Sequence, residues 1–439
     1  MATHEPLIVV LEGTPIGRIT RDDNWRLRLT FDEAYRSDPT ATELSVSMPR
    51  AVAVHTDAAV TPWLWGLLPD NDRVLARWGR EFATTTSSPF GLLSTKVGHD
   101  CAGAVQFAPE SEVDALVERT GDIEWLHEAQ VAQRLGELTA DSTAWLGPGF
   151  TGQFSLGGAQ AKTALHYDDT HGWGVPHGAV PTTHILKPAI AGIEAQDLNE
   201  HLCLSAARAL GLRAARSQLL TFEERTAIVV ERYDRATVDG QLIRVHQEDL
   251  CQAAGRHPGD KYQADGGPSP TDIVELLRTV IPGTAAHDAV QRFVDALVFN
   301  WLVAGTDAHA KNYSLLLSGS QIRMAPLYDI SSALPYDDSS GHKLHLAMKI
   351  GGEYRLRRID TTRSWDKLAR ELALDPAEVR LRALDLTTRA ADAFADASRD
   401  PAVVDIDSAL PARLTDLVAQ RSEVCARALR RVGDEADLA

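Results

Sequence analysis

Cysteine is scarce in this sequence, with four residues in 439. Cys101, Cys203, Cys251 and Cys425 are far apart and form no C-x-x-C pair. This distribution excludes a disulfide framework and a cysteine-based zinc site, and it suits a reducing compartment. Long apolar runs are also missing, since none reaches about 18 residues, roughly the length that a membrane-spanning helix needs. We therefore expect no membrane association.

Positive charge is in deficit as well. There are 44 Lys and Arg residues against 61 Asp and Glu residues, which gives a formal net charge of −17. Such a chain is not expected to bind nucleic acid broadly by itself. The N-terminus, MATHEPLIVVLEG, has no basic region followed by an apolar core and a cleavage site, so it does not predict a signal peptide. We expect a cytoplasmic protein.

The patterns that are present predict an α+β architecture. The length alone allows two or three domains. Short apolar strands at 7–11 and 16–19, followed by alternation from Trp25 to Phe31, predict a β-rich subdomain over residues 1–110. Residues 111–240 carry a glycine-rich loop, strands and one helix, and residues 241–439 are mostly helical. The segment 293–303 is apolar on nearly all sides, which predicts a buried helix.

The segment TDAHAKN, residues 306–312, is the most informative stretch, together with PLYDI at 326–330. Asp307 stands five positions before Asn312, and Asp329 follows after a strand-like segment. Protein kinases use this order: an Asp accepts the proton of the substrate hydroxyl, an Asn holds Mg²⁺, and a later Asp holds the nucleotide metals. Alone, D-x-x-x-x-N also fits a helix-capping Asp followed by a surface Asn.

A glycine-rich loop lies upstream, in the sequence FTGQFSLGGAQAKTALH at 150–166. The adjacent Gly157 and Gly158 would let backbone N–H groups approach phosphates closely. The loop fails the Walker A pattern, because Leu156 stands where a glycine belongs and Ala161 precedes Lys162. A hairpin turn without a ligand remains the alternative.

Two further segments follow in the order that a kinase uses. Lys187 ends the strand at 183–188, and Glu200 begins the next helix, so they could pair near the α and β phosphates. After the strand at 226–230, Glu231 and Tyr233 would line adenine and Asp234 would lie near the ribose. The alternatives are a solvated lysine, a glutamate favoured by the helix dipole, and ordinary surface charges at 232–235.

Taken together, several segments resemble the HipA family of bacterial serine/threonine kinase toxins over residues 7–350. The motifs that carry the resemblance are SLGGAQAKTAL, THILKP, VVERYDR, HQEDLCQAAG, KYQADGGPS, TDAHAKNYSLLL and APLYDI, with GLLPDN and GHDCAGAVQF near the N-terminus. The resemblance implies a two-lobed protein-kinase-like fold with an added N-terminal β-rich subdomain and an all-α C-terminal lobe.

The resemblance also implies a set of site residues. The catalytic residues would be Asp307, His309 and Lys187, and Asn312 and Asp329 would hold Mg²⁺. Ser155 would be a site of autophosphorylation. The ATP-binding residues would be Ser155, Gly157, Gly158, Ala159, Gln160, Lys162, Lys187, Glu231, Tyr233, Asp234, His309, Lys311, Asn312 and Asp329. Gly157 stands where an alanine is common in the family, which should loosen the loop.

The implied function is an ATP- and Mg²⁺-dependent protein kinase that acts as the toxin of a toxin–antitoxin pair. Its partners would be a helix-turn-helix antitoxin like HipB, DNA mainly through that antitoxin, and a substrate such as an aminoacyl-tRNA synthetase. Two alternatives stay open: a catalytically weak corepressor subunit, and a small-molecule or lipid kinase. A basic group could grip an anionic substrate or tRNA, or it could be a solvated loop: Lys349, Arg355, Arg357 and Arg358.

Overall fold

The computed structural model describes residues 5–190, 192–337, 343–361 and 363–430, and the chain divides into two compact units. Unit 1 comprises residues 1–188, 221–260 and 314–323, and unit 2 comprises residues 189–220, 261–313 and 324–439. The chain passes from one unit to the other five times. The boundaries expected near residues 110 and 240 stay predictions, since the two units are not contiguous segments.

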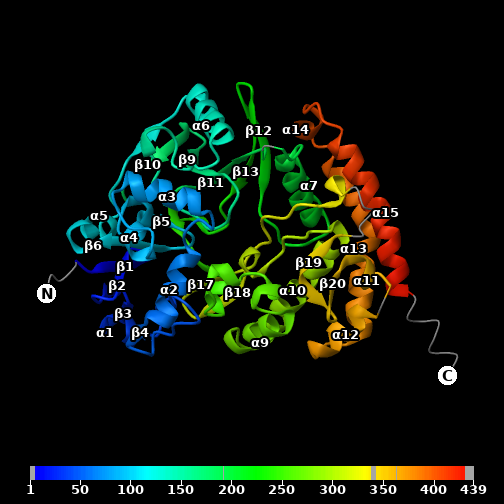
Figure 1. Ribbon diagram of the computed structural model, residues 1–439, viewed down its shortest axis with the longest axis horizontal. Helices are drawn as coiled ribbons and strands as arrows, with labels where there is room; N and C mark the ends of the chain where they lie inside the picture. Colours follow the sequence, from blue (N-terminus) through cyan, green and yellow to red (C-terminus); the bar gives the residue numbers. More distant parts are fainter. Residues whose placement is uncertain (1–4, 191, 338–342, 362, 431–439) are drawn as a thin grey trace. The chain divides into compact units, whose positions relative to one another are not determined.

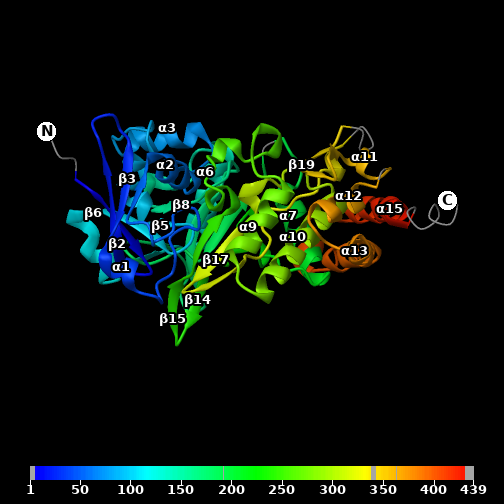
Figure 2. The ribbon, with the colours of Figure 1, turned by 90° about the horizontal axis from the view of Figure 1, so that it is seen from below.

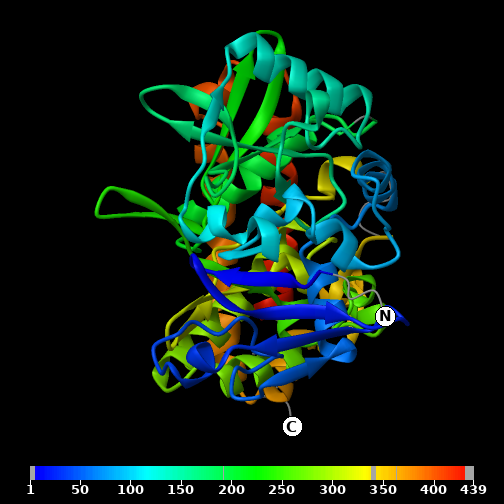
Figure 3. The same ribbon diagram turned by 90° about the vertical axis from the view of Figure 1, so that its left-hand side faces the viewer.

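Unit 1 begins with an antiparallel sheet of strand order β4-β3-β2-β1-β6, whose first strands are the blue arrows in Figure 3. Leu27, Leu29 and Phe31 point into the core, as their alternation predicts. Trp25 lies before the strand, with φ of 62° and 42% exposure. The strands are β1 (Leu7–Leu11), β2 (Thr14–Arg21), β3 (Leu27–Phe31), β4 (Val54–Thr56) and β6 (Val105–Pro109).

Large aromatic side chains fill the core of unit 1. Trp63 packs edge-on against Phe107, and Trp78 packs edge-on against Trp145; all four side chains are buried. Burial of such rings contributes strongly to stability. The helices of this unit are α1 (Glu33–Ser37), α2 (Asp57–Gly66), α3 (Asp72–Glu81), α4 (Pro89–Leu93), α5 (Val113–Val117), α6 (Glu128–Ala140) and α8 (Leu250–Ala253).

A second sheet has the order β12-β13-β11-β9-β10-β7. Helix α6 packs against β9, β11 and β13 (Figure 1). The expected strands at 183–188 and 226–230 are β11 and β13. The bounds are β7 (Ile123–Trp125), β9 (Thr163–Asp168), β10 (Gly172–Pro176), β11 (His184–Pro188), β13 (Arg225–Glu231) and β12 (Ser217–Phe222), the last of which crosses the boundary between the units.

Three small sheets complete the strand pairing around unit 1. β5 (Asp100–Cys101) pairs in parallel with β8 (Phe154–Ser155). β14 (Arg235–Val238) and β15 (Gln241–Arg244) form the hairpin that projects in Figure 2. A three-stranded sheet has the order β16-β17-β18, with β16 (His246–Asp249), β17 (Ser314–Ser318) and β18 (Gln321–Met324).

Unit 2 is mostly helical, and its two long helices α13 and α15 lie side by side (Figure 1). The expected buried helix is the C-terminal half of α10, where every residue from Phe293 to Val303 is buried. None of the helices in the described residues combines the length and the apolar composition that crossing a membrane requires. The bounds are α7 (Gln196–Ala209), α9 (Pro270–Val280), α10 (Thr284–Val303), β19 (His345–Ile350), β20 (Glu353–Arg355), α11 (Leu356–Ile359), α12 (Ser364–Glu371), α13 (Pro376–Ala397), α14 (Pro401–Val404) and α15 (Leu410–Arg430).

Candidate functional site

The glycine-rich loop connects β8 to β9 in unit 1, and its first residue is fully enclosed. Ser155 has no exposed surface, and its Oγ donates a hydrogen bond to the carbonyl of Leu67 at 2.8 Å. The carbonyl of Gly158 accepts from the backbone N–H of Asp70 at 3.0 Å. The loop is therefore anchored at two points on the segment that follows α2.

The lysine of this loop closes the loop on itself. Lys162 Nζ donates to the carbonyl of Gly157 at 2.7 Å and lies 5.0 Å above the ring of Trp145. Gly158 has φ of +96°, and a Cβ built there would lie 2.8 Å from Lys162 Nζ. The positive φ favours glycine at this position, and a larger residue would also have to move the end of the Lys162 side chain.

These residues fit an anionic ligand such as the phosphates of ATP. The side-chain nitrogen of Gln160 is buried without a hydrogen-bond partner among the described residues, and buried donors normally have one. The loop also carries the ammonium of Lys162 and a glycine that leaves room beside it. A phosphate oxygen would satisfy the Gln160 donor, and its negative charge would suit the nearby ammonium of Lys162.

Lys187 lies on β11, opposite Ile228 of β13, and only 5% of its surface is exposed. Glu200 is buried within α7. The two residues belong to different units, so their expected pairing stays a prediction.

The crossover segment, Glu231 to Arg235, leaves the end of β13. Glu231 is exposed there, and the hydroxyl of Tyr233 donates to the side-chain oxygen of Gln247. This hydrogen bond holds the tyrosine against β16 and fixes the path of the crossover segment after β13 ends.

Asp234 is buried and is not the surface charge of the alternative interpretation. Only 2% of its surface is accessible, and its carboxylate accepts hydrogen bonds from Arg232 and from the backbone of Gly103. Arg235 lies 3.1 Å from the same carboxylate. The place of Asp234 near the ribose stays a prediction, whereas Arg232 and Arg235 are buried and are not surface charges.

Asp100 is the second acid of this buried network. Its carboxylate accepts from Arg232, Arg235 and Arg244 at 2.9 to 3.2 Å and from Thr182 Oγ1 at 2.6 Å. Burial alone would raise the pKa of Asp100, but the three guanidinium groups outweigh it and hold the pKa well below its usual value. The network joins β5 and β15 to the crossover segment, all within unit 1.

In unit 2, the catalytic loop of the prediction begins directly after α10. Ala304 ends the helix with φ of 51°, and the N–H of Gly305 donates to the carbonyl of Asn300 at 2.7 Å. A Cβ at Gly305 would lie 2.2 Å from Asn300 Oδ1, so a larger residue would have to displace the buried Asn300 side chain. The loop therefore leaves a fully buried helix end in one defined direction.

Asp307 and Asn312 are brought together by hydrogen bonds within this loop. The side-chain nitrogen of Asn312 donates to the carbonyl of Asp307 at 2.8 Å, and the N–H of His309 donates to the same carbonyl at 2.8 Å. The Oδ1 atom of Asn312 accepts no hydrogen bond in the described part of the chain. Because its nitrogen is fixed, Asn312 can present this oxygen to a cation.

The carboxylate of Asp307 is exposed and is contacted on one oxygen. The hydroxyl of Tyr262 donates to Asp307 Oδ1, and His309 Nε2 lies 4.0 Å from the same oxygen. The rings of Tyr262 and His309 pack edge to face with centroids 4.9 Å apart. The side chain of Asp307 remains 70% exposed, so another molecule can reach its carboxylate.

The segment that carries Asp329 is fixed on both sides. Tyr328 donates its hydroxyl to the carbonyl of Lys311 at 2.6 Å, which brings this segment beside the loop that ends at Asn312. Leu327 forms a parallel bridge with Ala214, and Ser332 exchanges hydrogen bonds with Asn199 of α7 at 2.8 Å. Asp329 itself adopts φ of 56°, a conformation that Asp tolerates better than most residues.

These contacts fit a magnesium site of one Asp and one Asn. No cluster of three or more His, Cys, Asp or Glu side chains that could hold a metal occurs in the described ranges. Mg²⁺ commonly takes one or two protein ligands and completes its shell with phosphate oxygens and water, so Asn312 and Asp329 would suffice beside a nucleotide.

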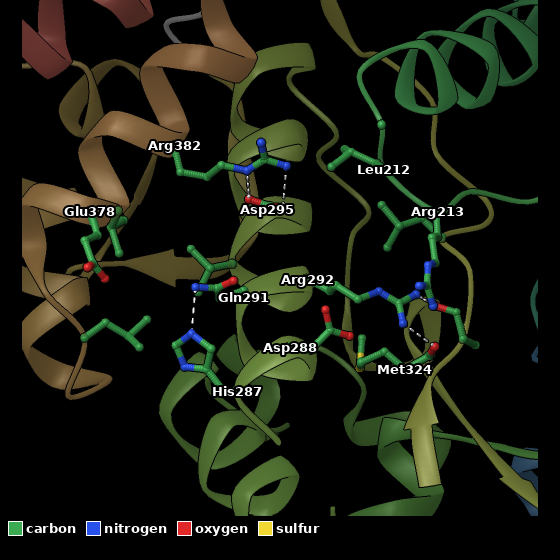
Figure 4. A pocket seen from close by; sticks show the side chains of 16 residues that line it. Leu212, Arg213, His287, Asp288, Gln291, Arg292, Asp295, Met324, Glu378 and Arg382 are labelled. Carbon is green, nitrogen blue, oxygen red and sulfur yellow. Dashed lines mark hydrogen bonds and ion pairs between the residues drawn. The ribbon is translucent and has the colours of Figure 1, made fainter. Parts of the chain in front are cut away.

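Unit 2 also contains a cavity of about 530 Å³ that includes none of the proposed catalytic residues. Figure 4 shows α10 and α13 on its walls, with Arg382 paired to Asp295 at 2.9 Å. Arg292 donates to the carbonyls of Met324 and Ala325 at 2.9 and 3.2 Å. The cavity thus shares a wall with the strand end that leads to Asp329.

Sequence reasoning missed the residues that anchor the predicted ones. Tyr262 and Tyr328 contact the catalytic loop, and Leu67 and Asp70 hold the glycine-rich loop. Their segments, KYQADGGPS, APLYDI and GLLPDN, were recognised as motifs, but nothing in the sequence shows which residue each side chain contacts.

Comparison with known proteins places these segments in a family. Residues 7–108 match the HipA N-terminal domain, and residues 154–394 match the HipA-like C-terminal domain. A Sinorhizobium fredii protein, "Putative kinase Y4mE", is 34% identical over 94% of this chain and 96% of its own length. The serine/threonine-protein kinase toxin HipA of Shewanella oneidensis is 28% identical over 68% of each chain.

The fold has a solved counterpart. A structure described as the Shewanella oneidensis HipA, HipB and operator DNA complex contains a chain that matches 98% of this one and 99% of its own length, with a TM-score of 0.80 and 23% identity. The expected fold class, a two-lobed kinase-like α+β protein, is confirmed by this match.

Proposed function

This chain belongs to the HipA family, and on that premise we propose that it is an ATP- and Mg²⁺-dependent serine/threonine protein kinase. The observation that carries the proposal is the loop from Asp307 to Asn312, in which the Asn312 side chain donates a hydrogen bond to the backbone carbonyl of Asp307 at 2.8 Å. Tyr328 ties this loop to the segment of Asp329. This is the arrangement that phosphoryl transfer needs, because the protein contributes position and charge rather than covalent chemistry.

Each residue has one task in this mechanism. Asp307 orients the acceptor hydroxyl and takes its proton, and Asn312 and Asp329 hold the cation. Lys187 and the Ser155–Lys162 loop would neutralise and cover the phosphates. His309 and Lys311 of the 306–312 loop would also contact ATP, and Glu231 and Tyr233 would lie beside adenine. ATP would supply the phosphoryl group, and Mg²⁺ would offset the charge on its oxygens.

The biological role follows from the relatives. We propose that the chain is the toxin of a toxin–antitoxin pair, that its partner is a helix-turn-helix protein like HipB, and that it reaches DNA through this partner. The support is the Shewanella HipA, which is named a kinase toxin and whose structure contains HipB and operator DNA. A translation component such as an aminoacyl-tRNA synthetase is the proposed substrate.

Ser155 is the proposed autophosphorylation site. Its side chain is fully buried and bonded to Leu67, so the loop must leave its present packing before the hydroxyl can react. A phosphate there would add about two negative charges inside the phosphate-binding loop. Repulsion from ATP should then keep the loop open and inactivate the enzyme.

The deciding experiment compares the wild type with Asp307→Asn. Removal of a preorganised charge typically costs about 3–4 kcal/mol of barrier, so the variant should lose detectable transfer from γ-labelled ATP. ATP affinity, measured by calorimetry, should stay nearly unchanged. Mass spectrometry of the wild type after incubation with ATP should find phosphate on Ser155.

Two results would contradict the proposal. Full transfer activity in Asp307→Asn would remove this residue from the role of base. ATP binding without any turnover by the wild type would favour the corepressor alternative.

A further inference from the structure

We infer that Tyr262 is a positioning residue for the base Asp307, an inference that rests on the proposed phosphotransfer function. Tyr262 lies in unit 2 with the catalytic loop, and its hydroxyl donates a hydrogen bond to Asp307 Oδ1. Neither the family match nor the name of any relative assigns this tyrosine a role.

The contact leaves the two carboxylate oxygens of Asp307 unequal. Oδ1 receives the tyrosine hydroxyl and faces His309 Nε2 at 4.0 Å. Oδ2 has no hydrogen bond or ion pair among the described residues, and the side chain is 70% exposed. The tyrosine thus restrains the rotation of the carboxylate and leaves Oδ2 open to an acceptor hydroxyl.

An exposed carboxylate needs such a constraint. Asp307 stands on a loop, and its backbone carbonyl is held by Asn312 and His309, but these bonds do not fix its side-chain torsions. Misplacement of a reacting group by about 1 Å can cost roughly 100-fold in rate. A phenol donor can hold the carboxylate in place without taking part in the transfer.

Tyr262 is itself well placed to act as a rigid support. Its ring packs edge to face on the buried His309 at 4.9 Å. The carbonyl of its neighbour Lys261 accepts from the N–H of Ala310 at 3.2 Å. The segment before α9 is therefore bonded to the catalytic loop at both the backbone and the side chain.

The test compares Tyr262→Phe with Tyr262→Ala in the full-length chain, using ATP turnover and self-phosphorylation with γ-labelled ATP. Tyr262→Phe keeps the ring contact with His309 and removes only the hydroxyl. We expect kcat to fall by about 10- to 100-fold, while the KM for ATP stays within about twofold. The melting temperature should not change. Tyr354→Phe, which removes a hydroxyl with no hydrogen bond in the described residues, should leave kcat unchanged.

Other outcomes would overturn the inference. Wild-type kcat in Tyr262→Phe together with a loss in Tyr262→Ala would mean that the ring only packs. Phosphate on Tyr262 after incubation with ATP would mean that its hydroxyl is an acceptor and not a support. An inactive wild type would sink the proposed function as well, whereas an active wild type with an equally active Tyr262→Phe would sink this inference alone.

Discussion

At the scale of single residues, Gly158 shows how a backbone conformation and a charge are coupled. Its φ of +96° is unfavourable for other residues, and the space where a Cβ would lie is bordered by Lys162 Nζ. That ammonium in turn holds the carbonyl of Gly157. One substitution should therefore disturb the turn and displace the ammonium of Lys162 together.

We predict that Gly158→Ala lowers stability by about 1–2 kcal/mol and raises the KM for ATP. The matched control is Gly172→Ala, which also lies in unit 1, has φ of +81° and has no atom within 4 Å of its added Cβ. Both variants should unfold at lower urea concentration, but only Gly158→Ala should lose affinity for ATP. Equal ATP affinity in the two variants would refute the coupling.

The sequence could propose residues for the site but could not describe their surroundings. The prediction of Asp307, Asn312 and Asp329 rests on their order and spacing, which follow from the chemistry of phosphoryl transfer. The burial of Asp234 could not be predicted, because two arginines and an acid that follow a strand fit either a ligand-binding site or an exposed surface segment. Distant residues, among them Asp100, Gly103 and Thr182, enclose that cluster, and no local pattern connects them to residue 234.

At the scale of elements, the buried network ties the short strand β5 to the crossover segment and to β15. Asp100 accepts from three arginines, and Asp234 accepts from two of them. The expected β-rich subdomain and the expected nucleotide-binding region are therefore joined by buried charge within unit 1. Removal of one acid would leave guanidinium groups buried without compensation.

We predict that Asp100→Asn destabilises the protein by about 3–5 kcal/mol, as expected when one partner of a buried ion pair is lost. The measurement is the midpoint of urea unfolding followed by tryptophan fluorescence. Asp32→Asn, which removes the carboxylate of a half-exposed pair with Arg18 at 4.0 Å, should leave the midpoint unchanged. Equal midpoints for both variants would show that the network contributes little.

Elements with strong periodicity were predicted well, and their partners were not. The strand at 7–11 and the buried helix at 293–303 follow from apolar patterns that can be seen within each segment alone. The pairing of β16 with β17 joins residues 246–249 to 314–318, and such long-range pairing is set by packing that no local window contains.

At the scale of the whole molecule, one buried acid should make stability depend on pH. Burial raises the pKa of Glu248 to about 7, against hydrogen bonds from Ser45, Val46 and Trp63 that favour its charged form. The folded state then holds a proton that the unfolded state releases near its ordinary value of 4.5. Stability should therefore fall as pH rises from about 4.5 to 7, by about 3 kcal/mol in total.

We predict that Glu248→Gln removes this part of the pH dependence. The measurement is the urea-unfolding free energy of wild type and variant at several values between pH 5 and 8, since other titrating groups cancel in the difference. The wild type should lose stability relative to the variant as pH rises. Glu423→Gln, which removes an exposed carboxylate, should run parallel to the wild type. A constant difference between wild type and Glu248→Gln would disprove the assignment.

The discontinuous course of unit 1 has a consequence for how the protein is made. Its last segment, residues 314–323, supplies β17, the neighbour of β16 that carries Glu248. While a ribosome is still translating upstream of this point, β16 lacks that neighbour, so unit 1 cannot finish folding during the first seventy per cent or so of synthesis. The catalytic loop leaves the exit tunnel just before the strand that completes this sheet. The nascent chain therefore carries Asp307, the proposed base, before unit 1 is finished, so the proposed activity should begin only after translation has passed both.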